Sequence, residues 1–222
     1  MKIVYVDGFK IRNTLDDDFA DVHWNTGRFS DFSSKFYIPE GETWIDHIFK
    51  KSGETDFLLK VDEEYYRYLL NKNLSGGENW RSYLDKKMLS SGPIPDFIIK
   101  KENINDLKVV YVDGALIRRF LDCQFFYGGH DLVYSYIPKN EIWLDIINDP
   151  AENKYFLVHE KTERELMAQG KKYDVAHRIA LAADMDARAE DGLGIYPGDE
   201  NYPWTGLSNE EIIKKYYVIN YE

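Results

Sequence analysis

The chain contains an internal repeat, and this repeat constrains its fold more than any other feature. Residues 2–19 and 108–125 are identical at eleven of eighteen positions, and residues 37–46 match 136–145 at a slightly shorter spacing. Self-similarity at this scale is typical of one supersecondary unit that is used twice. We therefore expect a tandem duplication.

The duplication predicts how the chain divides into domains. The first copy spans 1–100, the second spans 107–190, and 191–222 form an extension without a counterpart. A unit of about 85 residues buries only a limited hydrophobic core. We expect the two copies to pack against each other as a pseudo-dimer.

The second copy begins with strand-like sequence. Apolar residues alternate over 108–112, and Asp113-Gly114 is a dipeptide that favours the tight turn of a hairpin. Further strands are expected at 115–119, 132–137 and 141–145. Each copy is therefore predicted to contain a small antiparallel sheet.

Two helices are predicted after these strands. Asp149 is a suitable N-cap for a helix that runs to Ala168 and stops at Gly170, and a second helix is expected over 173–190. The first copy repeats this pattern, with helices at 54–71 and 78–89. The predicted fold class is α+β, in which two helices cover one face of each small sheet.

Two arginine and aspartate positions recur in both copies. They are Arg12 with Asp16 and Arg118 with Asp122. Because both repeats keep them, we expect these residues to hold the repeated fold together as ion pairs.

The predicted helix at 150–168 contains the sequence His-Glu-Lys-Thr-Glu at 159–163. It begins like the HExxH motif of metalloproteases, with Glu163 in place of the second histidine. Residues four apart share one helix face, and glutamate is an acceptable zinc ligand. We expect His159 and Glu163 to bind zinc and Glu160 to act as the general base on metal-bound water.

A third ligand is expected from the neighbouring helix. A short turn makes the two helices antiparallel, and Glu163 and His177 lie equally far from it, at the same level. His159, Glu163 and His177 would then form the three-ligand set of a catalytic zinc site. His130 and Asp184 remain alternatives for the third ligand.

The first copy provides an internal control for this site. Lys60 stands at the position of His159, Val61 at that of Glu160, and Glu64 at that of Glu163. A Lys60–Glu64 ion pair could replace the metal there. We therefore expect one zinc per chain, in the second copy only.

Two structural interpretations compete with the metal site. His159 and Glu163 could form an ordinary polar pair on a helix, and His177 could be a buried core histidine.

Composition excludes several classes of function. The chain has 39 acidic and 28 basic residues and a net charge of −11, which disfavours an extended nucleic-acid interface. No apolar run reaches the length of a membrane helix. Cys123 is the single cysteine, so neither a disulfide framework nor a thiolate metal cluster can form. We expect a cytoplasmic protein.

A resemblance follows from three motifs of the second copy. They are YVDGxxIRxxLDxxF, YIPxxEIWxD and HExxERxLMxxGxxYxxAH, in that order. This layout resembles small uncharacterised phage and bacterial proteins that carry one such unit. The likeness covers 107–190 and, in degenerate form, 1–100. The helix also resembles that of zincin-like metallopeptidases over His159, Glu160 and the ligand position at 163.

Two functions are compatible with these observations. The first is a zinc-dependent, metallopeptidase-like hydrolase that acts on a protein or peptide. The second is a non-enzymatic phage or bacterial protein that binds or modulates a host protein. In that second case, the HExxE remnant would be structural.

Overall fold

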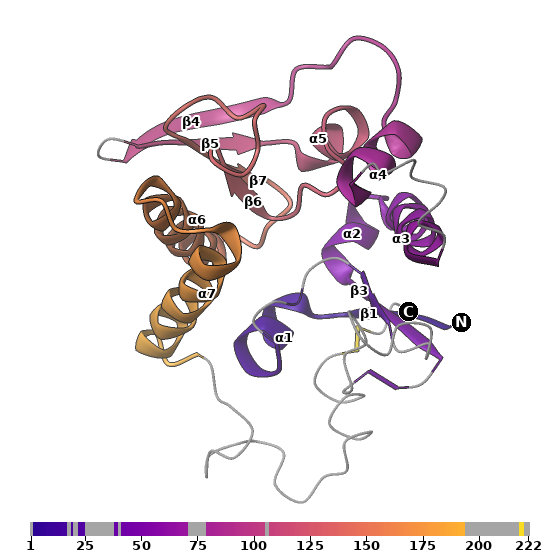
Figure 1. The fold of residues 1–222 in the computed structure, drawn as a ribbon. Coiled ribbons are helices and arrows are strands. Elements are labelled where there is room, and N and C mark those ends of the chain that lie inside the picture. The colour runs from indigo at the N-terminus through magenta and orange to yellow at the C-terminus, as the bar shows by residue number, and fades with distance from the viewer. Residues whose placement is uncertain are drawn as a thin grey trace, which may run out of the picture. The chain divides into compact units, whose positions relative to one another are not determined.

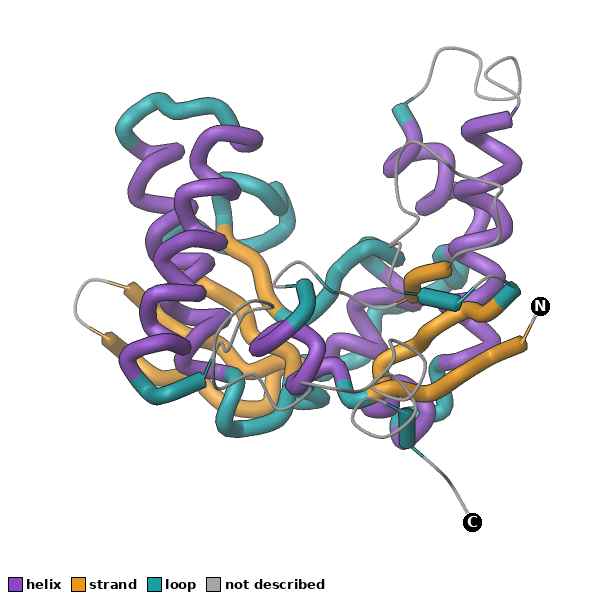
Figure 2. Tube along the Cα trace, turned by 90° about the horizontal axis from the view of Figure 1, so that it is seen from below, coloured by secondary structure: helices purple, strands orange, loops and turns teal. Residues whose placement is uncertain are grey.

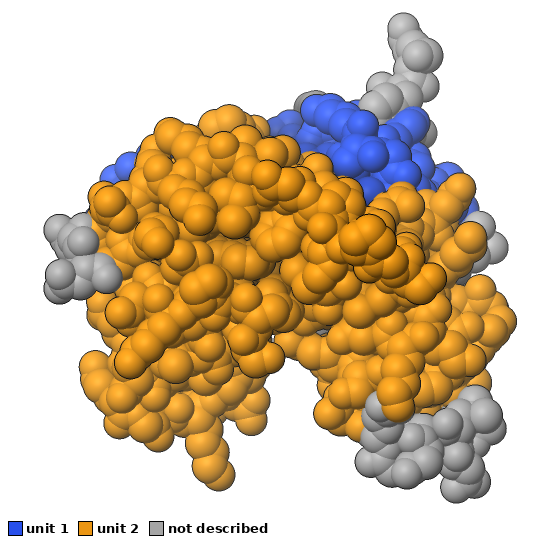
Figure 3. Space-filling model, turned by 90° about the horizontal axis from the view of Figure 1, so that it is seen from above, with its two compact units in different colours: residues 1–55, 185–222 blue, residues 56–184 orange. Residues whose placement is uncertain are grey.

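The computed structural model shows a mixed α+β protein, with seven helices and two sheets among the residues it describes (Figure 1). Those residues are 2–16, 19, 22–24, 38–39, 41–70, 79–104, 107–193 and 218–219. The chain forms two compact units, one of residues 1–55 with 185–222 and the other of 56–184 (Figure 3). We call them unit 1 and unit 2, and their boundaries differ from those of the two sequence copies.

Unit 1 contains a three-stranded sheet in the order β1-β3-β2. Strand β1 (Lys2–Val6) pairs in parallel with β3 (Glu42–Asp46), and β2 (Val22–Trp24) pairs with β3 in antiparallel fashion. Helix α1 (Gly8–Thr14) follows β1, and α2 (His47–Lys51) follows β3.

Unit 2 contains a four-stranded sheet in the order β4-β5-β7-β6. Strand β5 (Leu107–Val112) pairs in parallel with β7 (Glu141–Asp145), and helix α5 (Gly114–Phe120) follows β5. Two antiparallel edge strands complete the sheet, β4 (Ile98–Ile104) beside β5 and β6 (Gly128–His130) beside β7.

The prediction of wholly antiparallel sheets was wrong, because the Asp-Gly dipeptide starts a helix instead of a hairpin turn. The Asp113 carboxylate accepts a hydrogen bond from the Leu116 N–H at 3.2 Å, which makes Asp113 the N-cap of α5. The predicted strand at 115–119 is therefore helical. Since α5 carries the chain away from β5, the next long strand returns parallel to it.

The strand predicted at 132–137 was also wrong. These residues form turns, and the strand that pairs with β7 comes earlier, at β6. Strand β6 has two glycines among its three residues. Glycine has low intrinsic strand propensity, so this segment carries no local strand signal.

The helix predictions were largely confirmed. Helix α7 (Tyr173–Glu190) has the predicted bounds, and α6 (Asn153–Ala168) ends as predicted before Gly170, whose φ is +89°. Helix α6 begins later than expected, because Asp149 caps a preceding turn. The first-copy helices are α3 (Thr55–Leu70) and α4 (Trp80–Met88). Helix α6 lies against β6 and β7, with α7 beside it (Figure 2).

The hydrophobic cores of the two sheets use equivalent positions of the repeat. In unit 1 the buried cluster is Val4, Val6, Ile11, Phe19, Ile38 and Trp44. In unit 2 it is Val110, Val112, Ile117, Phe125, Ile137 and Trp143. In each unit, the core therefore packs the two parallel strands against the helix that follows the first of them.

Each unit also contains a buried ion pair between an arginine of its helix and an aspartate of its sheet. Arg118 donates to Asp145 Oδ2 at 2.7 Å, and Arg12 donates to Asp46 Oδ2 at 3.1 Å. The recurring arginines thus pair with the aspartate that ends β3 or β7, and the predicted pairing of Arg118 with Asp122 was wrong. Asp145 also accepts from the Gly114 N–H at 3.0 Å, and a Cβ at that position would overlap the carboxylate.

Little of the C-terminal extension belongs to the described residues. Val218 forms an antiparallel bridge with Val6, and the Ile219 N–H donates to the Tyr5 carbonyl at 2.8 Å. This short piece of the extension contacts β1 within unit 1. Across the described residues, no helix has the length and apolarity needed to cross a membrane.

Candidate metal centre

Helix α6 presents His159 and Glu163 on its buried face, as the sequence predicted. Together with Tyr155 they form a row at intervals of four residues, all three buried against the body of unit 2. Lys161 and Glu165 lie on the opposite, exposed face. A carboxylate in this row needs partners, because burial of an unpaired charge is costly.

Helix α7 brings His177 to the same level, also as predicted. His177 Nδ1 lies 2.7 Å from Glu163 Oε2 and 3.1 Å from His159 Nε2. His159 Nε2 lies 3.7 Å from Glu163 Oε2. Three potential metal-ligand atoms from two helices therefore converge on one point.

The separations of these atoms fit a tetrahedral zinc site. Zinc–nitrogen and zinc–oxygen bonds of about 2.0–2.1 Å place neighbouring ligands about 3.3 Å apart in a tetrahedron. The three observed separations, from 2.7 to 3.7 Å, lie on both sides of this value. The residues present therefore fit a zinc ion with a fourth position left for water.

His130 occupies a position that the sequence did not reveal. It ends strand β6, is fully buried, and its Nε2 lies 3.0 Å from Glu163 Oε1. Its Nδ1 accepts a hydrogen bond from the Leu132 N–H at 3.2 Å. A neutral imidazole with an accepting Nδ1 carries its proton on Nε2. His130 Nε2 therefore donates to Glu163, and His130 also belongs to a second group of potential metal-ligand atoms, with Glu160 and Glu163.

A neighbouring ion pair supports the contact between His130 and Glu163. Asp131 follows His130 and Arg164 follows Glu163, and Arg164 makes two hydrogen bonds to Asp131, at 2.5 and 3.1 Å. Bidentate arginine–carboxylate pairs hold both partners in a defined geometry. The end of β6 is thus joined to α6 through two neighbouring residue pairs.

Glu163 is held in its charged form by this arrangement. Burial by itself would raise its pKa, but hydrogen bonds with His130 and His177 and the nearby His159 ring outweigh that effect and place the pKa far below its usual range. One oxygen faces His130 and the other faces His177. The carboxylate is therefore ionised and oriented, as a metal ligand must be.

Glu160 lies beside the three donor atoms and not among them. Two groups of potential metal-ligand atoms, each within 4.8 Å of one another, share Glu163: one is His159, Glu163 and His177, and the other is His130, Glu160 and Glu163. Burial raises the pKa of Glu160, and the nearby Glu163 carboxylate raises it further. His159, His130 and His177 lower this pKa, but their effect is smaller. A carboxylate with a raised pKa next to a metal site has the properties of a general base.

Exposure increases across the site toward α7. The side chain of His130 is fully buried, that of Glu163 is 4% exposed, and that of His177 is 27% exposed. Tyr173 stacks on the His177 ring, with centroids 5.3 Å apart. A molecule from solvent would therefore reach the donor atoms past His177 and Tyr173.

Two of the three alternatives for the third ligand, His177 and His130, lie beside Glu163, and Asp184 does not take part. Asp184 is buried in α7, two turns beyond His177, and belongs to neither group of converging metal-ligand atoms among the described residues. His130 is a hydrogen-bond donor to Glu163. His177 Nδ1 lies within 3.1 Å of both His159 Nε2 and Glu163 Oε2.

At the first-copy positions equivalent to His159, Glu160 and Glu163, the described residues make other contacts. Lys60 is exposed and Val61 is buried in the core around α3 and α4. Glu64 accepts hydrogen bonds from Arg67 at 2.7 Å and from Tyr83 at 3.3 Å, so the predicted pairing with Lys60 was wrong. The register of β2 on β3 places Trp24 where the second copy has His130.

Comparison of the chain with protein-family models, curated proteins and solved structures finds no match. The resemblance to small phage and bacterial proteins and to zincin-like metallopeptidases stays a prediction.

Replacing His130 should weaken metal binding without removing the ligands. We expect His130→Ala to lower zinc affinity by about 10–100-fold at unchanged stoichiometry, because Glu163 loses the partner that orients it. Competition with a chromophoric chelator measures this affinity. His130→Gln, which can still donate from Nε2, should recover part of it. Complete loss of zinc in His130→Ala would instead identify His130 as a ligand.

Proposed function

We propose that this protein is a zinc-dependent hydrolase, similar in its chemistry to metallopeptidases, with a single site in the second copy. The observation that carries this proposal is the convergence of His159 Nε2, Glu163 Oε2 and His177 Nδ1, with separations of 2.7 to 3.7 Å. Two imidazoles and a carboxylate are a common ligand set of catalytic zinc.

The surrounding residues support a catalytic more than a structural metal. Structural zinc is closed by four protein ligands, whereas three ligands leave one position for water. Bound zinc lowers the pKa of that water to about 7. In this proposal Glu160 accepts the proton of that water. The raised pKa of Glu160 is closer to the pKa of the zinc-bound water than an ordinary glutamate pKa would be. Partial exposure of His177 leaves a path for a protein or peptide substrate.

We also propose that the two copies pack as a pseudo-dimer that exchanges helices. In unit 2, the Ser90 N–H just after first-copy helix α4 donates to the carbonyl of Arg119 in second-copy helix α5. In unit 1, Arg188 of second-copy helix α7 donates to Asn13 Oδ1 of first-copy helix α1 at 2.9 Å. Asn13 and Arg119 are equivalent positions of the repeat, so the contacts are reciprocal.

The number of zinc ions bound per chain tests the proposal directly. We expect elemental analysis of protein from zinc-supplemented cells to give about one zinc per chain, and none after His177→Ala. Glu64→Gln in the first copy is the matched control and should keep the full amount. Protein without zinc that also takes up none on titration would contradict the proposal, and two zinc ions per chain would contradict a single site.

A non-enzymatic role is favoured by one different observation. Glu163 already has a hydrogen-bonding partner on each oxygen, His130 at 3.0 Å and His177 at 2.7 Å, so the cluster can satisfy itself without a metal. The protein would then bind or modulate a host protein through another surface. The single, buried Cys123 suits a reducing compartment, and we place either function in the cytoplasm.

A further inference from the structure

A hollow, here called the notch, divides unit 2 into two lobes (Figure 3). The space-filling view shows two lobes of this unit with a hollow between them (Figure 3). One lobe carries α6 and α7 with the histidines, and the other carries α3 and α4, which belong to the first copy (Figure 1). The notch therefore separates helices of the second copy from helices of the first copy (Figure 1).

Arg81 of α4 is a cationic residue of this second lobe whose side chain reaches Tyr134 of the second copy. Its guanidinium lies 5.1 Å from the centroid of the Tyr134 ring and 5.4 Å from that of Trp80. It forms an ion pair with Asp122 Oδ2 at 3.6 Å, a separation longer than a hydrogen bond. Among the described residues no hydrogen bond reaches the guanidinium, and the side chain is 34% exposed. The guanidinium is thus held between two rings and beside Asp122, and part of it stays open to solvent.

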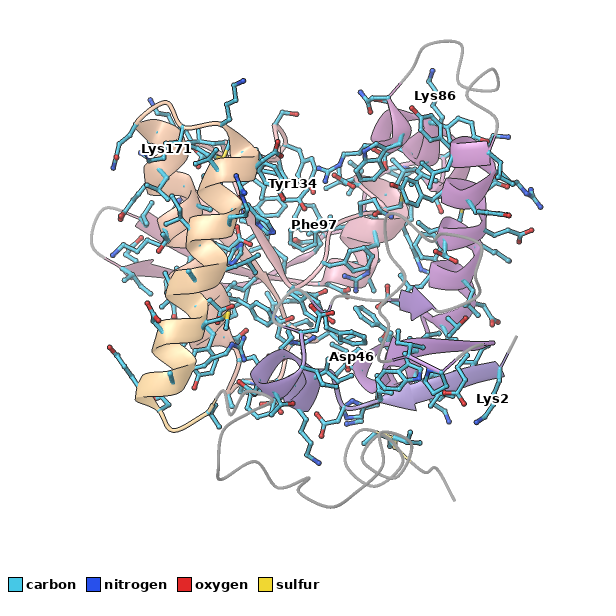
Figure 4. The ribbon with its side chains drawn as sticks, turned by 60° about the horizontal axis from the view of Figure 1, so that its bottom comes forward. Lys2, Asp46, Lys86, Phe97, Tyr134 and Lys171 are labelled. Carbon is cyan, nitrogen blue, oxygen red and sulfur yellow. The ribbon has the colours of Figure 1, made fainter. Side chains whose placement is uncertain are left out.

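Tyr134 connects this guanidinium to the metal centre. Its N–H donates to the His130 carbonyl at 3.0 Å, and its ring packs directly on Gly129. Figure 4 shows Tyr134 beside the α6–α7 helix pair. Burial raises the Tyr134 pKa, Arg81 opposes this, and Asp122, Glu160 and Tyr173 add to it. Arg81, Glu160 and Tyr173 therefore share one electrostatic neighbourhood around this ring.

We infer that Arg81 binds a carboxylate of the substrate while the scissile group lies at the metal. This inference rests on the proposed hydrolase function and adds to it a substrate class, molecules with a carboxylate near the cleaved bond. The guanidinium offers the paired donors that match a carboxylate, and the Tyr134 and Trp80 rings limit its movement. The degenerate copy would then have a function, because it supplies the specificity residue for the intact one.

Matched metal-binding probes test this inference without an enzymatic assay. ω-Carboxy alkyl hydroxamates with two to four methylenes are titrated into the zinc-loaded full chain by calorimetry, alongside their carboxamide isosteres. The members of each pair differ only in charge. We expect the best carboxylate probe to bind at least about tenfold more tightly than its amide, as one charge-assisted bidentate contact predicts.

Variants of α4 assign the effect to Arg81. Arg81→Ala should abolish the preference for the carboxylate and leave the affinity for the amide unchanged, and Arg81→Lys should keep part of the preference. Lys87→Ala removes an exposed charge from the same helix and should change neither affinity. A preference that survives in Arg81→Ala would overturn the inference.

The outcomes separate this inference from the proposed function. Equal affinities of the carboxylate and amide probes for the unaltered protein overturn the inference and leave the hydrolase proposal standing. Failure of every hydroxamate to bind shows that no open metal position exists, and both proposals fall. Competing peptides then identify the source of the carboxylate. Sensitivity to C-terminal amidation indicates a chain end, and sensitivity to Glu-to-Gln exchange indicates a side chain.

Discussion

His159→Ala should abolish stable zinc binding, with an affinity loss of roughly a thousandfold or more. The substitution removes one of three ligands, and loss of a residue that only hydrogen-bonds to a ligand already costs about 10–100-fold. Because zinc binds the folded state, its loss also lowers the melting temperature. Metal titration measures the first effect, and melting curves recorded with and without a chelator measure the second.

The chelator also provides the control for this prediction. The unaltered protein should melt at a lower temperature when zinc is withdrawn, whereas His159→Ala should melt at the same temperature in both conditions. Lys161→Ala, on the exposed face of the same helix, should behave like the unaltered protein. If His159→Ala changes neither zinc content nor melting, the pair with Glu163 is an ordinary polar contact.

Glu160→Gln should reduce hydrolytic turnover by about 10²–10⁴-fold while zinc stays bound, because the amide cannot accept the proton from metal-bound water. Stability should not fall. A carboxyl whose pKa is raised by folding opposes the folded state once the pH exceeds its usual pKa, so removing that charge preserves or increases stability near neutral pH. The measurements are kcat/KM on a peptide substrate, zinc content and the melting temperature.

Glu165→Gln is the matched control for this change, since it makes the same substitution on the exposed face of α6. It should keep activity, zinc and melting temperature. Release of zinc from Glu160→Gln as readily as from His159→Ala would make Glu160 a ligand. Full activity in Glu160→Gln would refute its role as the base.

The candidate site was predictable where it depends on helical periodicity. His159 and Glu163 are four residues apart, and His177 and Glu163 lie at equal distances from Gly170, so the regular rise of two antiparallel helices is enough to bring the three together. His130 was not predictable as a partner of Glu163. It ends a three-residue strand rich in glycine, and only the pairing of β6 with β7 places it under α6.

The sequence by itself determined the repeated unit, the two long helices of the second copy and the three converging donors. These features follow from internal identity and from local periodicity. Tertiary structure decided the sheet direction and the ion-pair partners. Asp113-Gly114 suits a hairpin turn and a helix N-cap equally well, and Arg118 finds Asp145 only once β5 and β7 are parallel neighbours. Such choices depend on contacts between distant residues, which local sequence preferences do not encode.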